Sequence, residues 1–436
     1  MLDVTHDPGS RSWVESANTS GHDFPIQNLP FGMFIRDGEK RVGVAIGDKI
    51  LDLTECAKDQ TLGTDLDALI LACTTGLNAL MGAPKAMVRR LRHRLFELLS
   101  SQNNSTIQAR EDRYLVDRLG AKMATPCEIR NYTDFLTSAH HTERHGRFKG
   151  LEVPLPPAFK YLPVAYHGRA SSITVSGSDV VRPHSQWKSA DGLIQFGLTP
   201  ALDFELEMAA FVGEGNILGS PIPLHQAREH IFGYCLLNDW SNRAGQWWEQ
   251  ILGPFLGKSF GTTISPWIIT EEALLPFRTS APVRDKADPE TLPYLTSHRH
   301  QCDGGLEVML EAQLHTEKMR AVSQPPEIIT RTRLSHLYWT FSQMLTHHAS
   351  NGCNLQAGDL LGSGTISGPE PESMACMAEK TEAGKKPFEL SNGETRLWLE
   401  DGDEVILTAR AEKAQFASIG FGECRGRVLP GVDWPR

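Results

Sequence analysis

The feature that most constrains the fold of this chain is a series of short β-rich runs from about residue 127 to the C-terminus. Glycine and proline separate the runs, which include SSITVSG, DFELEMAAFVG, SPWIIT, LEVMLEAQL and LWLEDGDEVILTA. Such a series predicts a predominantly β domain. One segment interrupts it, LSHLYWTFSQMLTHH at 334–348, whose apolar residues follow a helical period and predict a helix.

The chain before this series has a different pattern. The segment RVGVAIGDKILDL at 41–53 predicts a hairpin that turns at Gly47-Asp48, and KAMVRRLRHRLFELL at 85–99 predicts an amphipathic helix. With 436 residues, 40% of them hydrophobic, the chain is long enough for two domains. Together with the polar composition of the N-terminus, this predicts three parts: a disordered leader over 1–23, an N-terminal domain over 24–125 and a second domain over 126–436.

Charge and composition exclude several classes of partner. The formal net charge is −10, so the long-range field repels phosphate, and neither nucleic acid nor a membrane is an expected partner. No stretch approaches the roughly 20 apolar residues that cross a bilayer, and the N-terminus lacks the pattern of a secretory signal. The eight cysteines include no C-x-x-C pair. A reducing, cytoplasmic location is therefore the simplest expectation.

The strongest local signal for chemistry is the sequence DFELEM at 203–208. Side chains alternate along a strand, so Glu205 and Glu207 are expected to share one face about 7 Å apart. Two carboxylates aimed at one point repel each other unless a cation lies between them, and hard divalent cations prefer such oxygens. A solvated face of an amphipathic strand is the alternative. Asp134 and Asp239 are further candidates, although an isolated Asp after an apolar run is more often a turn or cap residue.

Two glycine-rich segments have the composition of loops that approach a small anion. The first, GPFLGKSFGTT at 253–263, resembles a Walker A loop but is one residue too short between its glycines, which argues against a nucleotide site. The second is GSGTISG at 362–368. In both segments glycine lets backbone N–H groups reach a carboxylate, and the first adds Lys258. Two tight structural turns are the alternative.

Long segments of the chain resemble the fumarylacetoacetate hydrolase family, in the same order along the sequence. They include FPIQNLPFG at 24–32, NYTDF at 131–135, LPVAYHGRASS at 162–172, IFGYCLLNDWS at 231–241 and GPFLGKSFGTTISPW at 253–267. The resemblance runs from about Phe24 to the C-terminus. It implies a mainly β (α+β) fold, with a small N-terminal SH3-like barrel followed by a mixed β-sandwich or roll that forms the catalytic domain. It also implies a homodimer.

The resemblance further implies the residues of an active site. Four acids would bind Mg²⁺ or Ca²⁺: Asp134, Glu205, Glu207 and Asp239. His141 would be the general base, oriented by Glu379. Three further catalytic residues would line the anionic side of the pocket: Arg243, Gln246 and Lys258. Contacts with the substrate or the metal shell are implied for Tyr166, Gly261, Thr262 and Thr365.

The implied reaction is metal-dependent hydrolysis of a carbon–carbon bond, converting 4-fumarylacetoacetate and water to fumarate and acetoacetate at the end of tyrosine and phenylalanine breakdown. Three pocket positions depart from the family pattern: Leu136 and Gln250 replace tyrosines, and Lys149 replaces an arginine. Lysine keeps the charge but loses the bidentate geometry. Two alternatives stay open: another 1,3-dicarbonyl substrate that is hydrolysed, decarboxylated or cyclised, or a non-enzymatic binding protein on the same fold.

Overall fold

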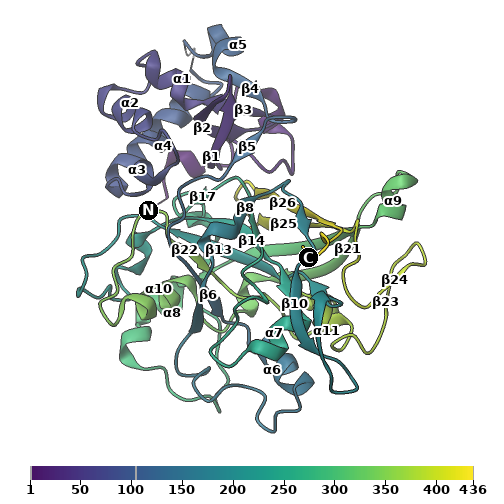
Figure 1. Cartoon of the computed structure of the whole chain (residues 1–436). Helices are drawn as coiled ribbons and strands as arrows, with labels where there is room; N and C mark the ends of the chain where they lie inside the picture. The colour runs from purple at the N-terminus through teal and green to yellow at the C-terminus, as the bar shows by residue number, and fades with distance from the viewer. Residues whose placement is uncertain (1, 104–105, 436) are drawn as a thin grey trace.

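The computed structural model describes residues 2–103 and 106–435. A small N-terminal domain, purple in Figure 1, sits on one end of a larger domain that contains the rest of the chain. Sheets dominate over helices in the architecture, which confirms the predicted mainly β (α+β) class.

The N-terminal domain is built on one five-stranded antiparallel sheet in the order β4-β3-β2-β1-β5. Its strands are β1 (Phe31–Arg36), β2 (Glu39–Ile46), β3 (Lys49–Asp52), β4 (Leu115–Asp117) and β5 (Met123–Ala124). Its helices are α1 (Leu53–Lys58), α2 (Thr64–Leu71), α3 (Asn78–Met81), α4 (Lys85–Leu99) and α5 (Glu111–Tyr114). The predicted hairpin and the predicted helix over 85–99 are confirmed by β2, β3 and α4.

Residues 2–23 are ordered in the structure. The prediction of a disordered leader is therefore wrong for these residues. Thr5 and His6 are buried, and Asp3 caps a short 3-10 helix over Val4–His6. The fully buried guanidinium of Arg92 on α4 donates to Thr5 Oγ1 at 3.0 Å. Composition alone could not reveal this because the partners of the segment lie about 90 residues away in α4.

The larger domain contains an eight-stranded sheet. Seven strands run in the order β7-β6-β22-β13-β14-β16-β8, and β17 also pairs with β14. The bounds are β6 (Tyr132–Leu136), β7 (Val164–Gly168), β8 (Ile173–Val175), β13 (Leu206–Val212), β14 (Ile231–Asp239), β16 (Thr262–Ile264), β17 (Ile269–Thr270) and β22 (Leu360–Gly362).

A second sheet of five strands, in the order β21-β20-β25-β26-β9, packs against β14 and β16 of the first. Its strands are β9 (Val180–Val181), β20 (Val308–His315), β21 (Glu327–Arg333), β25 (Glu404–Ala411) and β26 (Ile419–Leu429). Four two-stranded ladders complete the strands: β10 (His184–Lys188) with β11 (Ile194–Leu198), β12 (Leu202–Asp203) with β15 (Ser241–Asn242), β18 (Arg278–Thr279) with β19 (Gly305–Leu306), and β23 (Phe388–Glu389) with β24 (Thr395–Arg396).

Both faces of the eight-stranded sheet are covered. Met208 and Ala210 of β13 belong to the core shared with the second sheet, whereas Ala209 and Phe211 belong to the core of the N-terminal domain. Every residue of β13 is buried, which explains the nearly continuous apolar run in its sequence. Polar groups on these strands are therefore held away from water, where electrostatic interactions are strong.

The helices of the larger domain are short and lie outside the sheets. They are α6 (Ala139–Phe148), α7 (Arg243–Glu249), α8 (His298–Asp303), α9 (Glu317–Ala321), α10 (Phe341–Ala349) and α11 (Met377–Lys380). The helix predicted over 334–348 begins only at Phe341, because Thr340 and Gln343 form a capping box that starts it there. Within the described residues, no helix is both long and apolar enough to cross a membrane.

Candidate active site

Three acidic side chains from three strands of the eight-stranded sheet meet. Asp134 lies on β6, Glu207 on β13 and Asp239 at the end of β14. One carboxylate oxygen from each lies within 4.8 Å of the others, and all three side chains are buried. The solvated-face alternative for this segment is therefore excluded for Glu207, which is completely buried.

Two glycines make room for these carboxylates. Gly362 on β22 pairs with Asp134 across the sheet, and a Cβ atom on this glycine would lie 2.5 Å from Asp134 Oδ1 and 3.3 Å from Glu207 Oε2. Gly364 has a φ of +74°, and its backbone N–H donates to Glu207 Oε2 at 3.0 Å. The glycine-rich loop thus brings a backbone donor to a carboxylate, as its sequence predicted, although the carboxylate belongs to the protein.

The acid cluster has the properties of a site for a hard divalent cation. Asp134 Oδ1, Glu207 Oε1 and Asp239 Oδ1 are buried atoms without a hydrogen-bond partner among the described residues. Burial and repulsion from neighbouring carboxylates, Glu205 included, raise the pKa of all three carboxyl groups, most strongly those of Asp134 and Glu207. Three converging oxygens that lack donors fit Mg²⁺ or Ca²⁺, because these cations take oxygen ligands.

The fourth predicted ligand, Glu205, lies beside this cluster but is paired with basic groups. Its carboxylate contacts Lys258 Nζ at 2.7 Å and Arg243 Nη1 at 2.6 Å. Burial alone raises the pKa of Glu205, but Lys258 and Arg243 outweigh it and hold the pKa well below its usual value. Lys258 Nζ also contacts Asp239 Oδ2 at 2.5 Å, so this ammonium group joins Glu205 to the acid cluster.

His141 lies on the first turn of α6, where Ser138 caps the helix by accepting from the His141 backbone N–H at 3.2 Å. Its Nδ1 is 3.0 Å from Glu379 Oε2, a contact that fits Nδ1–H donating to the carboxylate. Its Nε2 lies 3.4 Å from Thr365 Oγ1 and 3.9 Å from Glu205 Oε1. The predicted pairing of His141 with Glu379 across the pocket is therefore present.

Glu379 is held as an ion by several donors. Arg144 Nη1 donates to its Oε1 at 2.9 Å, and Ser367 Oγ donates to its Oε2 at 2.5 Å. Burial opposes ionisation, but His141, His145 and the hydrogen bond from Ser367 lower the pKa of Glu379 far below its ordinary value. An ionised Glu379 fixes the orientation of the imidazole and favours the tautomer with the proton on Nδ1.

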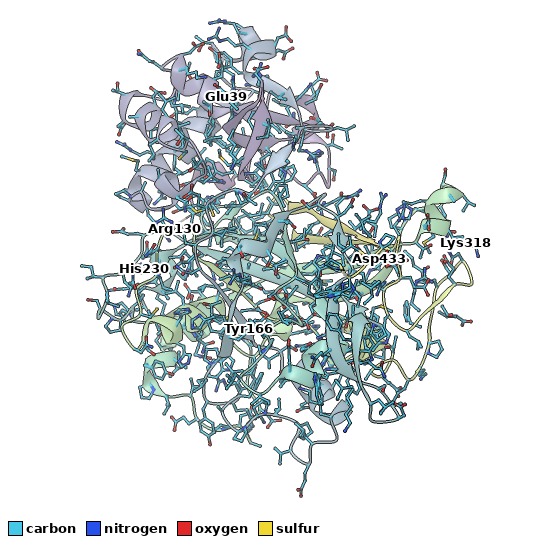
Figure 2. The ribbon with its side chains drawn as sticks, viewed as in Figure 1. Glu39, Arg130, Tyr166, His230, Lys318 and Asp433 are labelled. Atoms are coloured by element: carbon cyan, nitrogen blue, oxygen red, sulfur yellow. The ribbon has the colours of Figure 1, made fainter. Side chains whose placement is uncertain are left out.

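A cavity of about 300 Å³ opens onto these groups. The predicted residues that line it are Asp134, Leu136, His141, Lys149, Tyr166, Glu205, Arg243, Gln246, Gln250, Lys258 and Thr365. Tyr166, labelled near the middle of the larger domain in Figure 2, donates from its hydroxyl to Asp239 Oδ2 at 3.1 Å. Most of the sequence-predicted residues therefore meet in one place.

Five predicted residues are not among those that line this cavity: Glu207, Asp239, Glu379, Gly261 and Thr262. Gly261 lies near Trp240 and Val180, and Thr262 lines a smaller neighbouring cavity of about 180 Å³ with Asp239 and Lys258. At the outer part of the main cavity, Lys149 Nζ donates to Gln250 Oε1 at 2.6 Å. The two departures from the family pattern at these positions therefore contact each other.

The structure also adds residues that sequence reasoning missed. Asp203 accepts from Arg243 Nε at 2.9 Å and from two backbone N–H groups at the start of α11, so it joins the acid segment to Glu379. His145 lies one helical turn after His141 and lines the cavity. The spacing of the two histidines was the only signal in the sequence for His145.

The chain matches two sequence families over most of its length. Residues 27–126 match the family described as Fumarylacetoacetase N-terminal, and residues 127–429 match the family described as Fumarylacetoacetate (FAA) hydrolase C-terminal. A solved structure, fumarylacetoacetate hydrolase (EaFAH) from psychrophilic Exiguobacterium antarcticum, has a TM-score of 0.50 at 18% identity, covering 92% of this chain and 99% of that chain. This likeness shows a shared fold.

Individual relatives are similar along nearly their whole length. The fumarylacetoacetase of Bos taurus is 47% identical over 434 residues, which covers 97% of this chain and all of the relative. The fumarylacetoacetase of Homo sapiens is 45% identical over 423 residues, covering 94% of this chain and 97% of the relative. These matches and the assembled site lead to one conclusion: the chain belongs to the fumarylacetoacetate hydrolase family.

Proposed function

We propose that this chain hydrolyses 4-fumarylacetoacetate to fumarate and acetoacetate, a step in tyrosine and phenylalanine breakdown. The observation that carries the proposal is the His141–Glu379 pair facing one cavity together with the buried acid cluster. Relatives named fumarylacetoacetase, at 41 to 47% identity and from animals, plants and Dictyostelium discoideum, support the choice of substrate.

Asp134, Glu207 and Asp239 are the proposed ligands of Mg²⁺ or Ca²⁺, with Glu205 next to them. Their unpartnered oxygens and raised pKa values support this assignment. When bound, the cation supplies Lewis-acid polarisation of the two carbonyl oxygens of a 1,3-diketone. The remaining steps are assigned to side chains of this protein.

His141 is the proposed general base. With its Nδ1 proton directed to Glu379, its Nε2 is free to take a proton from a water molecule in the cavity. The resulting hydroxide adds to one carbonyl carbon, and the carbon–carbon bond breaks as the neighbouring carbon leaves as an enolate. His141 then gives the proton that it took from water to this carbon.

Arg243 and Lys258 are placed to stabilise the negative charge that develops on the attacked oxygen. Arg243 is almost fully buried, and its Nη2 has no hydrogen-bond partner among the described residues. Nη2 is therefore available to a substrate oxygen. Buried, preorganised donors of this kind contribute strongly to transition-state stabilisation. Gln246 accepts from Arg243 Nη1 at 3.1 Å and helps to orient the guanidinium group.

The direct test is turnover of 4-fumarylacetoacetate by the full chain in the presence of Mg²⁺ or Ca²⁺. We expect the ultraviolet absorbance of the diketo acid to disappear, with one fumarate and one acetoacetate formed per substrate consumed. Chelation by EDTA should stop the reaction and added cation should restore it. A cation-loaded, folded protein that leaves the substrate intact would refute the proposal.

A second candidate function is the same chemistry on another 1,3-dicarbonyl acid. Leu136 and the Lys149–Gln250 contact favour it, because they change the polar groups that meet the outer end of a substrate. The double variant Leu136→Tyr, Lys149→Arg tests this idea. If fumarylacetoacetate is not the native substrate, we expect its kcat/KM to rise about tenfold, which corresponds to about 1.4 kcal/mol from the restored bidentate arginine and tyrosine contacts. An unchanged or lower kcat/KM speaks for fumarylacetoacetate itself.

We also propose a homodimer located in the cytoplasm. Ile194 and Phe196 on β11 are about half exposed, and Phe196 makes a ring contact with the exposed Trp434 at 4.7 Å between centroids. An exposed apolar group of this size favours burial against a second copy. All eight cysteines are free thiols, which suits a reducing compartment.

A further inference from the structure

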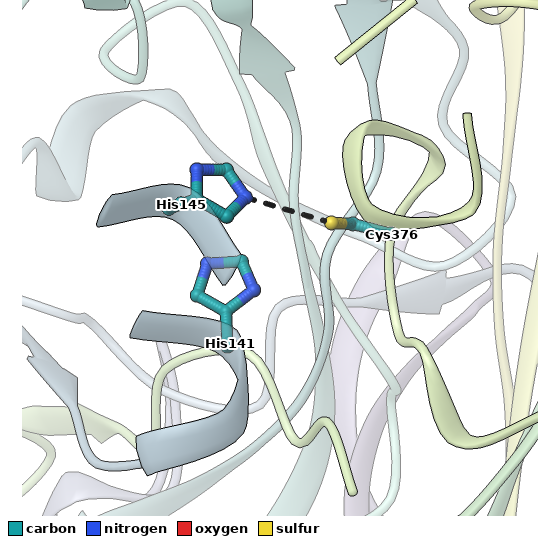
Figure 3. A group of neighbouring side chains, drawn as sticks. All are labelled: His141, His145 and Cys376. Atoms are coloured by element: carbon teal, nitrogen blue, oxygen red, sulfur yellow. Dashed lines mark hydrogen bonds between the residues drawn. The ribbon is translucent and has the colours of Figure 1, made fainter. Parts of the chain in front are cut away.

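A second group of side chains that can bind a metal ion includes His141 itself, together with His145 and Cys376. His141 and His145 are four residues apart on α6, so their rings share one face of the helix, with centroids 4.2 Å apart. Figure 3 shows Cys376 facing them from the segment before α11. Cys376 Sγ is 4.0 Å from His145 Nε2, and one donor atom from each of the three residues lies within 4.8 Å of the others.

The donor chemistry differs from that of the acid cluster. Two imidazole nitrogens and one sulfur are ligands for Zn²⁺ and similar borderline cations, whereas Mg²⁺ and Ca²⁺ take oxygen. Zn–N bonds of about 2.0 Å and Zn–S bonds of about 2.3 Å place tetrahedral donors roughly 3.3–3.6 Å apart. The observed separation of 4.0 Å between His145 and Cys376 needs only a small side-chain movement to reach this geometry.

The group is open to an incoming ion on one side. His141 and His145 both line the 300 Å³ cavity, so a cation can enter from it and keep a water molecule in its fourth position. Cys376 is completely buried, and its thiol donates to Glu379 Oε2 at 3.3 Å. Binding therefore replaces the thiol proton with the metal and releases that proton to solvent.

We propose that His141, His145 and Cys376 form an inhibitory site for Zn²⁺, separate in ligands from the carboxylate site. The inhibitory part rests on the proposed function, because a metal on His141 removes the base that activates water. The protein would then respond oppositely to two classes of cation: hard cations at the carboxylates support turnover, and borderline cations at the histidines stop it.

The metal site can be tested without any substrate. Full-length protein saturated with Mg²⁺ is titrated with Co²⁺, which replaces Zn²⁺ and gives a thiolate-to-cobalt charge-transfer band in the near ultraviolet when sulfur is a ligand. We expect one equivalent of Co²⁺ to produce the band and Zn²⁺ to abolish it. Absence of the band in folded protein would overturn the proposal.

Variants locate the ligands. Cys376→Ser and His145→Gln should lose the band, whereas Cys353→Ser, which removes a half-exposed thiol near His347 and His348, should keep it. Loss of the band in Cys353→Ser with retention in Cys376→Ser would place the metal elsewhere and contradict the assignment. Circular dichroism confirms that each variant is folded.

Inhibition is measured separately on Mg²⁺-loaded protein. Half-inhibition by Zn²⁺ should need at least about tenfold more metal in Cys376→Ser than in the unaltered chain, each relative to its own zinc-free rate, since losing a ligand costs at least as much affinity as losing an outer partner. Relief of inhibition by excess Mg²⁺ would instead place zinc at the carboxylates. If the protein proves inactive on fumarylacetoacetate, the cobalt band still decides whether the site exists.

Discussion

Replacing His141 with alanine is expected to slow hydrolysis of 4-fumarylacetoacetate about 10²- to 10⁴-fold, the usual contribution of a positioned general base. The imidazole is fixed from one side by Glu379 at 3.0 Å, so its free nitrogen points into the cavity where water must be activated. The loss should fall mainly on kcat, because His141 acts on water and contributes little to holding the substrate.

His140→Ala is the matched control for this measurement. His140 is the preceding residue on the same helix and is partly buried, but it does not line the cavity. Removing its side chain makes the same chemical change in the helix but leaves the water-activating group in place. We therefore expect turnover within about threefold of the unaltered chain. A His141→Ala protein that binds cation, is folded and keeps more than a tenth of its activity would contradict the assigned role.

The site shows which inferences a sequence supports and which depend on the fold. Alternation along a strand predicted that Glu205 and Glu207 share a face. The named strand β13 begins only at Leu206, and the Glu205 backbone N–H donates to the side chain of Asn238 at 3.2 Å, but the Glu205 carbonyl still accepts from the Asp239 N–H of β14 at 3.3 Å. Glu205 therefore lies close to Glu207, as alternation predicts, but the strand pattern could not show that Glu205 is paired with Lys258 and Arg243.

The basic partners of Glu205 could not be predicted from the sequence either, because they are distant from it in the chain. Lys258 and Arg243 lie about 40 to 50 residues from Glu205, and only the pairing of strands brings them within 3 Å of it. Cys376 lies 231 residues from His145, and no sequence motif around it predicts that it contacts this histidine. Resemblance to a family supplied the main ligands and the base, but it could not supply contacts that this chain makes outside the family pattern.

The second large effect is expected on cation-dependent stability when Glu207 is replaced. Glu207→Gln should abolish stabilisation of the protein by Mg²⁺ or Ca²⁺, because the amide has the shape of the carboxylate but lacks its charge. At a cation concentration 100 times the Kd, the unaltered chain gains about 2.7 kcal/mol, which raises Tm by about 3 °C for a protein of this size. Thermal unfolding with and without cation measures the difference.

The exposed Glu290 provides a control, since Glu290→Gln makes the same chemical change outside the acid cluster and should leave the cation effect intact. An equal Tm increase in Glu207→Gln and in the unaltered chain would show that the cation binds elsewhere. Isothermal titration of the same proteins reports the Kd directly, so a small Tm change caused by irreversible unfolding does not obscure the result.

The effect of Glu207→Gln should reverse sign when cation is removed. In the cation-free fold, burial and the neighbouring Asp134 and Asp239 raise the pKa of Glu207 well above its ordinary 4.5, so the folded state binds more protons than the unfolded chain. Stability from this group is therefore present at pH below 4.5 and is lost as pH rises toward the folded pKa. Glutamine cannot ionise and so avoids this loss, and at pH 8 in EDTA the variant should therefore unfold at a higher temperature than the unaltered chain. With cation the order should invert, because the unaltered site exchanges its protons for the metal and the variant cannot hold it.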